Sequence, residues 1–396
     1  MEVKPGYRQT EVGMIPEDWS VKPLGEVVTF LDGKRRPVKD TDRAKMRGSI
    51  PYYGASGIVD YVNDYLFDDE LILLGEDGEN ILSRNCRLAF RISGKAWVNN
   101  HAHVLKPNSD VSLGFLTDYL ESLNYERFNS GTAQPKLNKQ TCTGILVALP
   151  PTKAEQEAIA MALSDADALI ESLEQLLAKK RHLKQGAMQE LLTGKKRLPG
   201  FENKPGYKQT EVGVIPEDWY FDYIENLAHI TTGGKNTQDR VDDGEYPFFV
   251  RSQTVERINS YSYDGEAVLT AGDGVGTGKV FHYINGKFDA HQRVYRISEF
   301  SERISGYFFY LYFSNHFYNR IMQMTAKSSV DSVRREMIAR MLVPLPPTKA
   351  EQTAIAAILS DMDAEIAALE QRLAKARQLK QGMMQELLTG RIRLIN

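Results

Sequence analysis

The sequence has few cysteines, no long apolar run and no excess of one charge. Only Cys86 and Cys142 occur, without metal-ligand spacing, which favours free thiols in a reducing cytoplasm. The apolar stretch Tyr307–Phe313 is far shorter than the roughly 18 residues that indicate a membrane span. Charged and polar residues follow Met1, where a signal peptide would be apolar. We therefore expect a cytoplasmic protein that makes no use of a membrane.

The balance of charge excludes one class of nucleic-acid binding. Residues 21–148 contain 16 Lys/Arg and 16 Asp/Glu, and residues 221–344 contain 14 and 15. Such neutrality is not typical of proteins that bind nucleic acid regardless of its sequence. The segment Gly33–Gly48 differs, because it holds seven basic and two acidic residues. It is either a solvated loop or a phosphate contact, and its place at the start of a variable region favours the contact.

Several enzymatic motifs are incomplete. The segment Gly272–Val280 resembles a Walker A phosphate loop, but Asp273 stands where its first glycine belongs and Val280 replaces the hydroxyl residue. Each "LPPT" has a leucine, Leu149 or Leu345, where the tetrad of amino-methyltransferases has Asn or Asp. Three histidines of the variable regions lack the spacing of a metal or hydrolytic site, so we expect polar surface contacts or satisfied core positions at His101, His103 and His291.

What the sequence does contain is an internal repeat of two segments. The segment "KPGYRQTEVGMIPEDW" (4–19) returns with two changes at 204–219. A longer block, 149–198, returns at 345–394 with 37 of 50 residues identical. A repeat of this length in two copies predicts a pseudo-dimer within one chain of 396 residues.

Each longer block predicts a helix with defined ends. Thr152 and Glu155 match a T-x-x-E capping box, and Gly194 matches a C-terminal cap. Thr348, Glu351 and Gly390 repeat these signals in the second copy. Apolar residues recur by four and three, which indicates a coiled-coil seam that Leu169, Leu176 and Leu183 widen in the first copy. About 41 residues between caps give roughly 60 Å of helix, so we expect the two helices to pair with each other, antiparallel.

The regions between the repeats share a backbone frame but few side chains. "GEDG" (75–78) stands opposite "AGDG" (271–274), and "NNHAHVL" (99–105) opposite "DAHQRVY" (289–295), which sets His101 against His291. Short β-like runs alternate with turn residues, and a helical stretch follows in each region. We predict two mixed α/β domains of one fold with different surfaces. The aromatic segment from Tyr307 has helical spacing and predicts core packing.

The order of "TEVGMIPEDW", "YYGASGIVDY", "LLGEDG", "VNNHAHVLKP" and "LPPTKAEQEAIA", all duplicated, resembles the specificity (S) subunit of type I restriction-modification enzymes over the whole chain. The resemblance implies an α/β (mixed α+β) fold with two similar target recognition domains separated by an antiparallel coiled coil of two long helices. The implied organisation is domain 1 at 1–148, spacer helix 1 at 149–198, domain 2 at 199–344 and spacer helix 2 at 345–396.

The resemblance also implies partners and cofactors. Two methyltransferase (M) subunits, with adenine-N6 activity and S-adenosylmethionine, dock on the duplicated regions of such proteins, and ATP-dependent restriction (R) subunits join them. This chain is then a non-catalytic subunit that holds no cofactor or metal and binds an asymmetric, bipartite double-stranded DNA target. S-adenosylmethionine, ATP and Mg are expected on the partners. Two identical docking surfaces independently predict two copies of one partner.

Candidate DNA contacts come from loops that the shared frame places at equivalent positions. Arg, Asn and Gln read base edges bidentately, whereas Lys holds phosphates. In the first domain the candidates are Lys34, Arg35, Arg36, Lys45, Arg47, Tyr53, Ser56, Asn99, Asn100, His101, Gln134 and Lys136. In the second they are Lys235, Asn236, Arg251, Ser252, Gln253, His291, Arg293, Lys327 and Ser328.

Two other functions fit parts of the sequence. A self-sufficient DNA-modifying enzyme would account for a DNA-binding surface, but the methyltransferase and nuclease motifs are missing. A coiled-coil adaptor would account for the helices, but not for paired domains with matching frames and unlike loops. Recognition of DNA accounts for both.

A helix of roughly 60 Å exceeds one DNA turn of about 34 Å, so we predict half-sites one to two turns apart, centre to centre. Insertion of four residues into both helices should lengthen the unread gap and leave both half-sites unchanged. Selection of bound sequences from a random pool measures this. An altered half-site would contradict the idea that the helices set the spacing.

Overall fold

The computed structural model describes residues 5–131, 134–202, 206–324 and 332–394. The chain divides into two compact units, which are residues 1–174 with 371–396, and residues 175–370. Both boundaries fall inside the 39-residue helices α6 (Lys153–Leu191) and α10 (Lys349–Leu387). Each unit therefore contains one globular domain and one half of each long helix. None of the described helices is long and apolar enough to cross a membrane.

Two sheets form the domain of unit 1, in strand orders β6-β5-β10-β7 and β4-β11-β8-β9. Strand β8 is buried along its whole length, and helix α4 packs its apolar face against it and β9. The strands are β4 (Val28–Phe30), β5 (Arg47–Gly54), β6 (Gly57–Val62), β7 (Phe67–Asp68), β8 (Leu71–Gly75), β9 (Ala89–Ile92), β10 (Lys95–Val98) and β11 (Ala102–Pro107). The helices are α1 (Leu24–Val27), α2 (Asp40–Arg43), α3 (Asn80–Ser83), α4 (Leu113–Ser122) and α5 (Lys139–Thr143), with short 3-10 turns η1 (Asp32–Lys34) and η2 (Glu126–Phe128).

The domain of unit 2 has one six-stranded sheet in the order β16-β21-β19-β20-β17-β18. Phe308, Phe309, Phe313 and Phe317 of α8 are fully buried against it, which confirms core packing for the aromatic segment. The strands are β16 (His229–Thr232), β17 (Tyr246–Phe249), β18 (Glu256–Ile258), β19 (Tyr263–Ala271), β20 (Phe281–Ala290) and β21 (Val294–Ser298). The helices are α7 (Ile224–Leu227), α8 (Gly306–Met324) and α9 (Arg335–Ala339), with the 3-10 turn η3 (Thr237–Asp239).

Short paired strands join each domain to its helices. In unit 1 these are the hairpin of β1 (Tyr7–Thr10) with β2 (Gly13–Pro16), and β3 (Ser20–Pro23) with β12 (Leu146–Leu149). In unit 2 they are the hairpin of β13 (Tyr207–Thr210) with β14 (Gly213–Pro216), and β15 (Tyr220–Tyr223) with β22 (Leu342–Leu345). Each repeated sixteen-residue segment therefore contains a hairpin.

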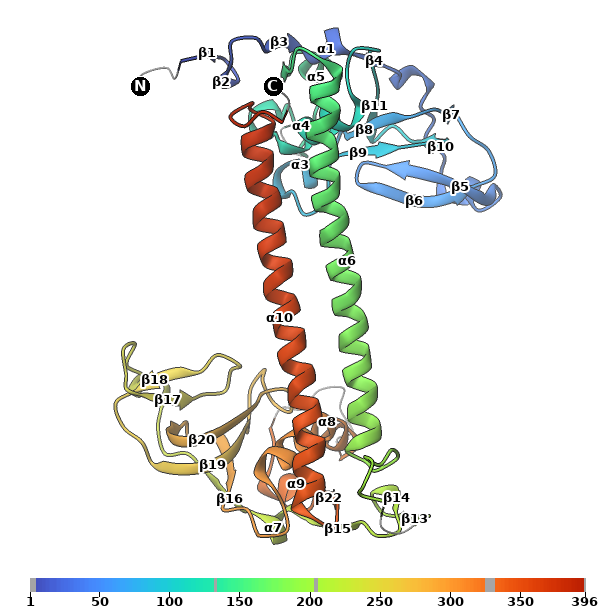
Figure 1. The fold of residues 1–396 in the computed structure, drawn as a ribbon. Helices are drawn as coiled ribbons and strands as arrows, with labels where there is room; N and C mark the ends of the chain where they lie inside the picture. The colour runs from blue at the N-terminus through green and yellow to red at the C-terminus, as the bar shows by residue number, and fades with distance from the viewer. Residues whose placement is uncertain (1–4, 132–133, 203–205, 325–331, 395–396) are drawn as a thin grey trace. The chain divides into compact units, whose positions relative to one another are not determined.

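The long helices pack antiparallel within each unit (Figure 1). In unit 1, Lys380 binds Asp167 at 2.6 Å and Arg377 binds Glu174 at 2.6 Å, so later residues of α6 meet earlier residues of α10. In unit 2 the same order appears in ion pairs of α6 with α10, which are Lys180–Glu365, Arg181–Glu370 and Lys184–Asp363. The antiparallel pairing that the sequence predicts is confirmed.

The prediction that three further leucines widen the seam is wrong. Leu169, Leu176 and Leu183 are 49%, 38% and 48% exposed, whereas Leu163 and Leu359 of the seam are fully buried. The seam is narrow because each helix has one partner helix, so a position next to the seam faces solvent. Lys180 and Lys184, which occupy seam positions, form ion pairs with Glu365 and Asp363 of the partner helix and are partly exposed.

The repeated segments meet in one joint per unit. In unit 1, Arg393 after α10 binds Glu155 in the first turn of α6 and Asp18 after β2, with Nη2–Oε2 at 2.8 Å and Nη1–Oδ1 at 3.0 Å. In unit 2, Arg197 binds Glu351 and Asp218, each at 2.7 Å. We call each set of three side chains a clamp. It explains why the sixteen residues occur twice, since each copy supplies one carboxylate.

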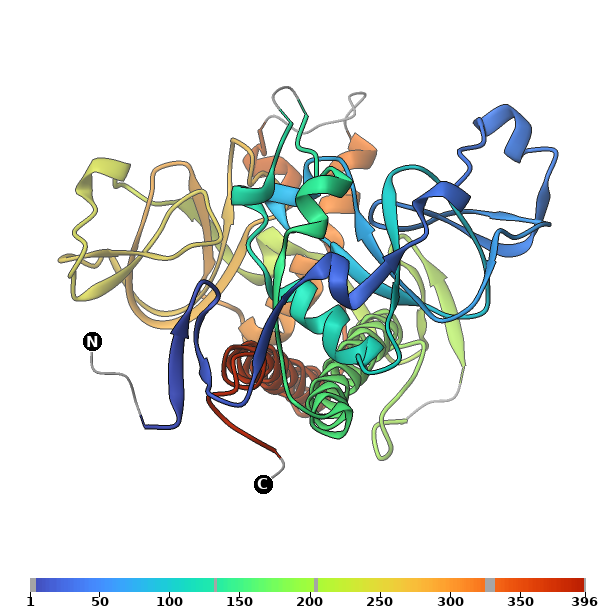
Figure 2. The ribbon, with the colours of Figure 1, turned by 90° about the horizontal axis from the view of Figure 1, so that it is seen from above.

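A close approach fixes the hairpin against the end of the helix. Gly390 has φ +68°, and a Cβ there would lie 2.6 Å from Pro16 and 3.0 Å from Trp19. Gly194 has φ +71° and the same neighbours in unit 2, Pro216 and Trp219. Figure 2 shows the hairpin β1–β2 beside the C-terminal end of α10, where the Tyr7 hydroxyl donates to the Gly390 carbonyl. Only glycine satisfies both the left-handed backbone and the available space.

The capping boxes form only in part. The Thr152 and Thr348 hydroxyls accept from the N–H groups of Glu155 and Glu351, at 3.3 and 3.2 Å. The glutamates do not return the bond in the way that the motif predicts, because the clamp arginines bind their carboxylates. The motif therefore predicts correctly where both helices begin. The ion pairs with Arg393 and Arg197 replace the hydrogen bond that its glutamate would make to the backbone.

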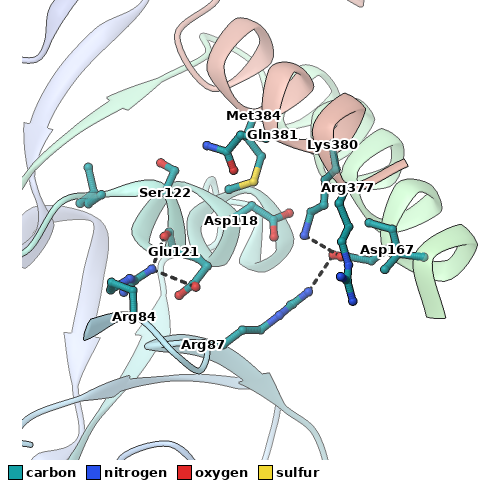
Figure 3. A pocket seen from close by; sticks show the side chains of 12 residues that line it. Arg84, Arg87, Asp118, Glu121, Ser122, Asp167, Arg377, Lys380, Gln381 and Met384 are labelled. Carbon is teal, nitrogen blue, oxygen red and sulfur yellow. Dashed lines mark hydrogen bonds and ion pairs between the residues drawn. The ribbon is translucent and has the colours of Figure 1, made fainter. Parts of the chain in front are cut away.

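Unit 1 contains a polar cavity of about 430 Å³ between α4 and the helix pair (Figure 3). Asp167 accepts ion pairs from Lys380 at 2.6 Å and Arg87 at 2.9 Å, and these hold its pKa below the ordinary value although burial opposes them. The Asp118 side chain points into the same cavity, is 7% exposed, and forms no hydrogen bond or ion pair with the described residues, although the charges of Arg91 and Lys380 partly oppose the effect of burial. Burial raises the pKa of Asp118 to about 6.

The clamps should differ in strength. In Arg197→Met, Glu351 and Asp218 stay buried without a partner, so we expect a loss of about 3–5 kcal/mol in the free energy of unfolding. The matched variant Arg393→Met should lose less, because Asp18 is 52% exposed and water can replace its half of the clamp, so that only Glu155, at 3%, stays buried without its arginine. Urea unfolding followed by circular dichroism measures both. A larger loss in Arg393→Met would contradict burial as the cause.

Two carboxylates of the cavity should respond oppositely to pH. The folded protein binds the Asp118 proton more tightly than the unfolded chain, so stability is full below about pH 4 and falls as the pH rises to about 6. Asp118→Asn should therefore stabilise by about 1–3 kcal/mol at pH 7.5 and change little at pH 4. Asp167→Asn, the control, should destabilise at pH 7.5, since it removes the carboxylate that Lys380 and Arg87 bind directly. Equal effects of Asp118→Asn at both pH values would refute the assignment.

Candidate nucleic-acid interface

Four loops meet at one edge of the domain in unit 1. Strands β5 and β10 are parallel neighbours with Tyr53 opposite Val98, so the loops that follow them lie side by side. The pairing of Gly75 with Ala102 brings the turn after β8 to the same place, and a bridge between Asp77 and Lys136 adds the fourth segment. We call these segments, 54–57, 75–78, 99–101 and 134–136, the loop edge of unit 1.

The domain of unit 2 builds the same edge from different residues. Phe249 lies opposite Ala290 in the parallel pair, Ala271 opposite Val294, and Asp273 bridges to Ser332. The loop edge of unit 2 therefore comprises the segments 250–253, 271–274 and 291–293, with residue 332. Two domains of one fold with matching loops were predicted, and the two sets of pairings agree.

Hydrogen bonds establish which positions correspond. The Glu76 N–H donates to the His101 carbonyl at 2.8 Å, as the Gly272 N–H does to the Arg293 carbonyl at 2.7 Å. The Asn99 and His291 N–H groups donate to Tyr53 and Phe249 in the same way. Asn99 thus corresponds to His291 and His101 to Arg293. The expected alignment of His101 with His291 was wrong by two residues. It paired two residues because both are histidine, although the strands of the two domains differ in length.

Most predicted contacts of unit 1 are exposed. Two exposed residues lie away from the loop edge: Lys45 forms an ion pair with Asp42, and Arg47 begins β5 at the end opposite its loop. Three others are at least half-buried: Tyr53 packs near Phe90, Arg35 is in an internal network, and Asn99 is 8% exposed. The exposed residues at or beside the loop edge are Lys34, Arg36, Ser56, Asn100, His101, Gln134 and Lys136.

The predicted contacts of unit 2 divide similarly. Lys235 and Asn236 are half-buried; Asn236 caps η3 and accepts from Gln292 at 2.6 Å. His291 is 6% exposed, and its Nδ1 accepts from the Arg293 N–H at 3.0 Å. Lys327 and Ser328 lie outside the described residues. The exposed residues at the loop edge are Arg251, Ser252, Gln253 and Arg293.

A buried charge network supports the loop edge of unit 1. Glu76 binds Arg35 at 2.6 Å and Lys136 at 3.4 Å. His103 binds Asp32 through Nδ1 and the Leu137 carbonyl through Nε2, each at 2.8 Å, which requires both ring nitrogens to donate. Although burial opposes it, the Asp32 carboxylate raises the pKa of His103 to about 10. Of the two alternatives that the sequence leaves open for its histidines, His103 takes the satisfied core position, and it carries a charge.

Sequence reasoning missed the carboxylates of the loop edges. Asp77 lies 2.9 Å from His101 Nδ1, and Asp273 binds Arg251 at 2.8 Å and Arg293 at 3.7 Å. The aspartate shared by "GEDG" and "AGDG" is the available signal, but its presence in both motifs does not by itself indicate an ion pair. No group of described residues has the composition of a metal site.

The comparisons with known proteins agree with this fold. The family model described as "Type I restriction modification DNA specificity domain" matches residues 16–179 and 216–378, which together make up most of the chain. The chain is 27% identical to the type I restriction enzyme MjaVIII specificity subunit of Methanocaldococcus jannaschii, over 96% of this chain and 95% of that protein. It is 31% identical to the EcoDI specificity subunit of Escherichia coli, over 45% of this chain and only 38% of that protein.

Solved structures share the fold at low sequence identity. The type I restriction-modification S subunit from M. genitalium has a TM-score of 0.66 at 13% identity, over 98% of both chains. A chain from a study of assembly and conformational transition of a type I system has a TM-score of 0.52 at 15% identity, over 96% of this chain and 99% of that one. With the family model matched twice, once in each repeat, the chain belongs to the type I restriction-modification DNA specificity family.

Proposed function

We propose that the two loop edges read the two unlike halves of an asymmetric, bipartite DNA target. One observation carries this proposal: the edges share backbone hydrogen bonds residue by residue, yet the side chains that they expose differ. Asn100 and Gln134 offer amides in unit 1, whereas Arg251 and Arg293 offer guanidinium groups in unit 2. Amides suit adenine edges and guanidinium groups suit guanine edges, so different bases are selected by one scaffold.

Phosphate contacts supply affinity beside the edge. Lys34 and Arg36 are exposed, and the Arg36 N–H donates to Val98 at the end of β10, so both lie next to the loop that reads bases. Lys45 and Arg47 lie farther from the edge and can contact only backbone phosphates of neighbouring base pairs. The nearly neutral domains leave non-specific affinity low, which favours discrimination between sequences.

The duplicated segments provide two equivalent docking surfaces. In each unit a clamp, largely buried itself, joins a hairpin, a helix start and a helix end from these segments, with the same residue types in both units. Equivalent surfaces bind two copies of one partner, and we assign them to two methyltransferase subunits. Restriction subunits join that assembly. In this scheme the chain itself is non-catalytic and cytoplasmic, and S-adenosylmethionine, ATP and Mg belong to its partners.

Sequence selection from a random DNA pool, with the full chain and methyltransferase subunits, tests the proposal. The expected result is two short blocks of specified bases that differ from each other and flank unspecified bases. Enrichment of no sequence would favour an adaptor without a DNA role. A single block would contradict recognition by both domains.

Loss of a phosphate contact should act on all sequences alike. Lys34→Ala and Arg36→Ala should each weaken binding several-fold for selected and unselected DNA, and reduce the slope of log affinity against log salt by about 1. Fluorescence anisotropy over a salt series measures both. Lys45→Ala is the control, since Asp42 already neutralises that lysine and its effect should be smaller. A change in the selected bases would contradict a phosphate role for Lys34 and Arg36.

A further inference from the structure

One carboxylate occupies the same position in both loop edges. Asp77 and Asp273 each stand two residues beyond the last residue of a buried strand, β8 or β19, and each bridges to the fourth segment of its edge. Both Asp77 oxygens lie 2.9 Å from His101 Nδ1. One Asp273 oxygen binds Arg251 Nη1 at 2.8 Å, and the other lies 3.7 Å from Arg293 Nε.

The side chains that face these carboxylates also correspond. His101 and Arg293 have carbonyls that accept from equivalent N–H groups, those of Glu76 and Gly272. Their own N–H groups are held by a side chain two residues earlier, from Asn99 at 2.8 Å and from His291 at 3.0 Å. The backbone at this position is therefore fixed on both sides, while the side chains are 51% and 65% exposed. The carboxylate therefore influences the orientation of the side chain and not the position of the backbone.

Stability does not account for these pairs. Ion pairs between exposed groups contribute little, because solvent screens them and two side chains lose freedom. Arg293 faces Asp273 through Nε in an ion pair at 3.7 Å, so both of its terminal nitrogens stay available to a ligand, in the fork that matches guanine O6 and N7. The negative charge of Asp273 costs little beside DNA, since Arg251 and Arg293 share it and the set carries a net positive charge.

We propose that Asp77 and Asp273 are equivalent positioning residues that aim His101 and Arg293 at one base pair in the first and second half-sites, and that Arg293 specifies guanine. This rests on the function proposed above. His101, held at Nδ1, presents only Nε2. It makes one hydrogen bond where Arg293 makes two, so the first half-site is less strict at this base pair.

Loss of the carboxylate tests the positioning role. Asp273→Asn should reduce the guanine preference at one base pair of the second half-site by about tenfold, within the 5- to 150-fold range of a bidentate contact. The first half-site and the unfolding temperature should not change. Arg293→Lys should lose the same guanine preference. Asp273→Glu, which keeps a carboxylate, should lose less of it than Asp273→Asn. Asp77→Asn, the matched control, should affect one base pair of the first half-site alone.

A transplant tests the same inference as a gain of function. His101→Arg places a guanidinium opposite Asp77, and should introduce a guanine preference of about 5- to 150-fold at one base pair of the first half-site. The double variant His101→Arg with Asp77→Asn should show little of it. The readout is sequence selection with the full chain and methyltransferase subunits, followed by affinity measurements on DNA that differs at that base pair.

Each outcome supports or overturns the inference. If Asp273→Asn weakens binding equally for all sequences, Arg293 holds a phosphate and the inference fails, although the proposed function stands. If Asp273→Asn lowers the unfolding temperature and leaves the base preference intact, the carboxylate is only structural and the inference again fails. If the unaltered chain selects no sequence, the proposed function fails first and the inference falls with it.

Discussion

The architecture depends on an arginine shared by two carboxylates. Arg197 with Glu351 and Asp218, and Arg393 with Glu155 and Asp18, each join three segments that are distant in sequence. Removal of such charges from water is costly unless every partner is present. The clamp therefore forms only when a helix end, a helix start and a hairpin arrive together. That condition explains why all three segments are duplicated with so few changes, whereas the domains between them vary.

In the loop edges, by contrast, the backbone geometry is shared by the two units and the side chains differ. Their positions depend on main-chain hydrogen bonds and on buried strands, and residues of different chemistry do the same structural work. Asn99 and His291 both accept the N–H two residues later, although one is an amide and the other an imidazole. Stability thus rests on the backbone and the core, and under the proposed function recognition rests on the exposed side chains. The charged network of Glu76, Arg35 and His103 is present in unit 1 under an edge whose counterpart has Gly272 in place of Glu76.

The sequence predicted the elements that local chemistry determines. Threonine caps and the C-terminal glycines placed both long helices, and the spacing of apolar residues predicted their pairing. The exposure of Leu169 and Leu183 was not predictable, because periodicity indicates a face and not how wide a partner covers it. The alignment of the edges failed for a related reason: a hydrogen-bonding role, rather than the identity of a residue, marks equivalent positions. The ion pair of Asp77 was not predictable either, because its partner His101 is distant in sequence and only the folded chain brings the two together.

Because the edges are held by the main chain, their exposed residues are free to vary one at a time. A change at position 101 or 293 alters what the edge presents, but leaves the bonds of Glu76 and Gly272 to the carbonyls intact. New recognition properties can therefore arise through single substitutions, without an unfolded intermediate on the way. If the loop edges read DNA as proposed, this feature offers a route from one target sequence to another along which every intermediate protein stays folded.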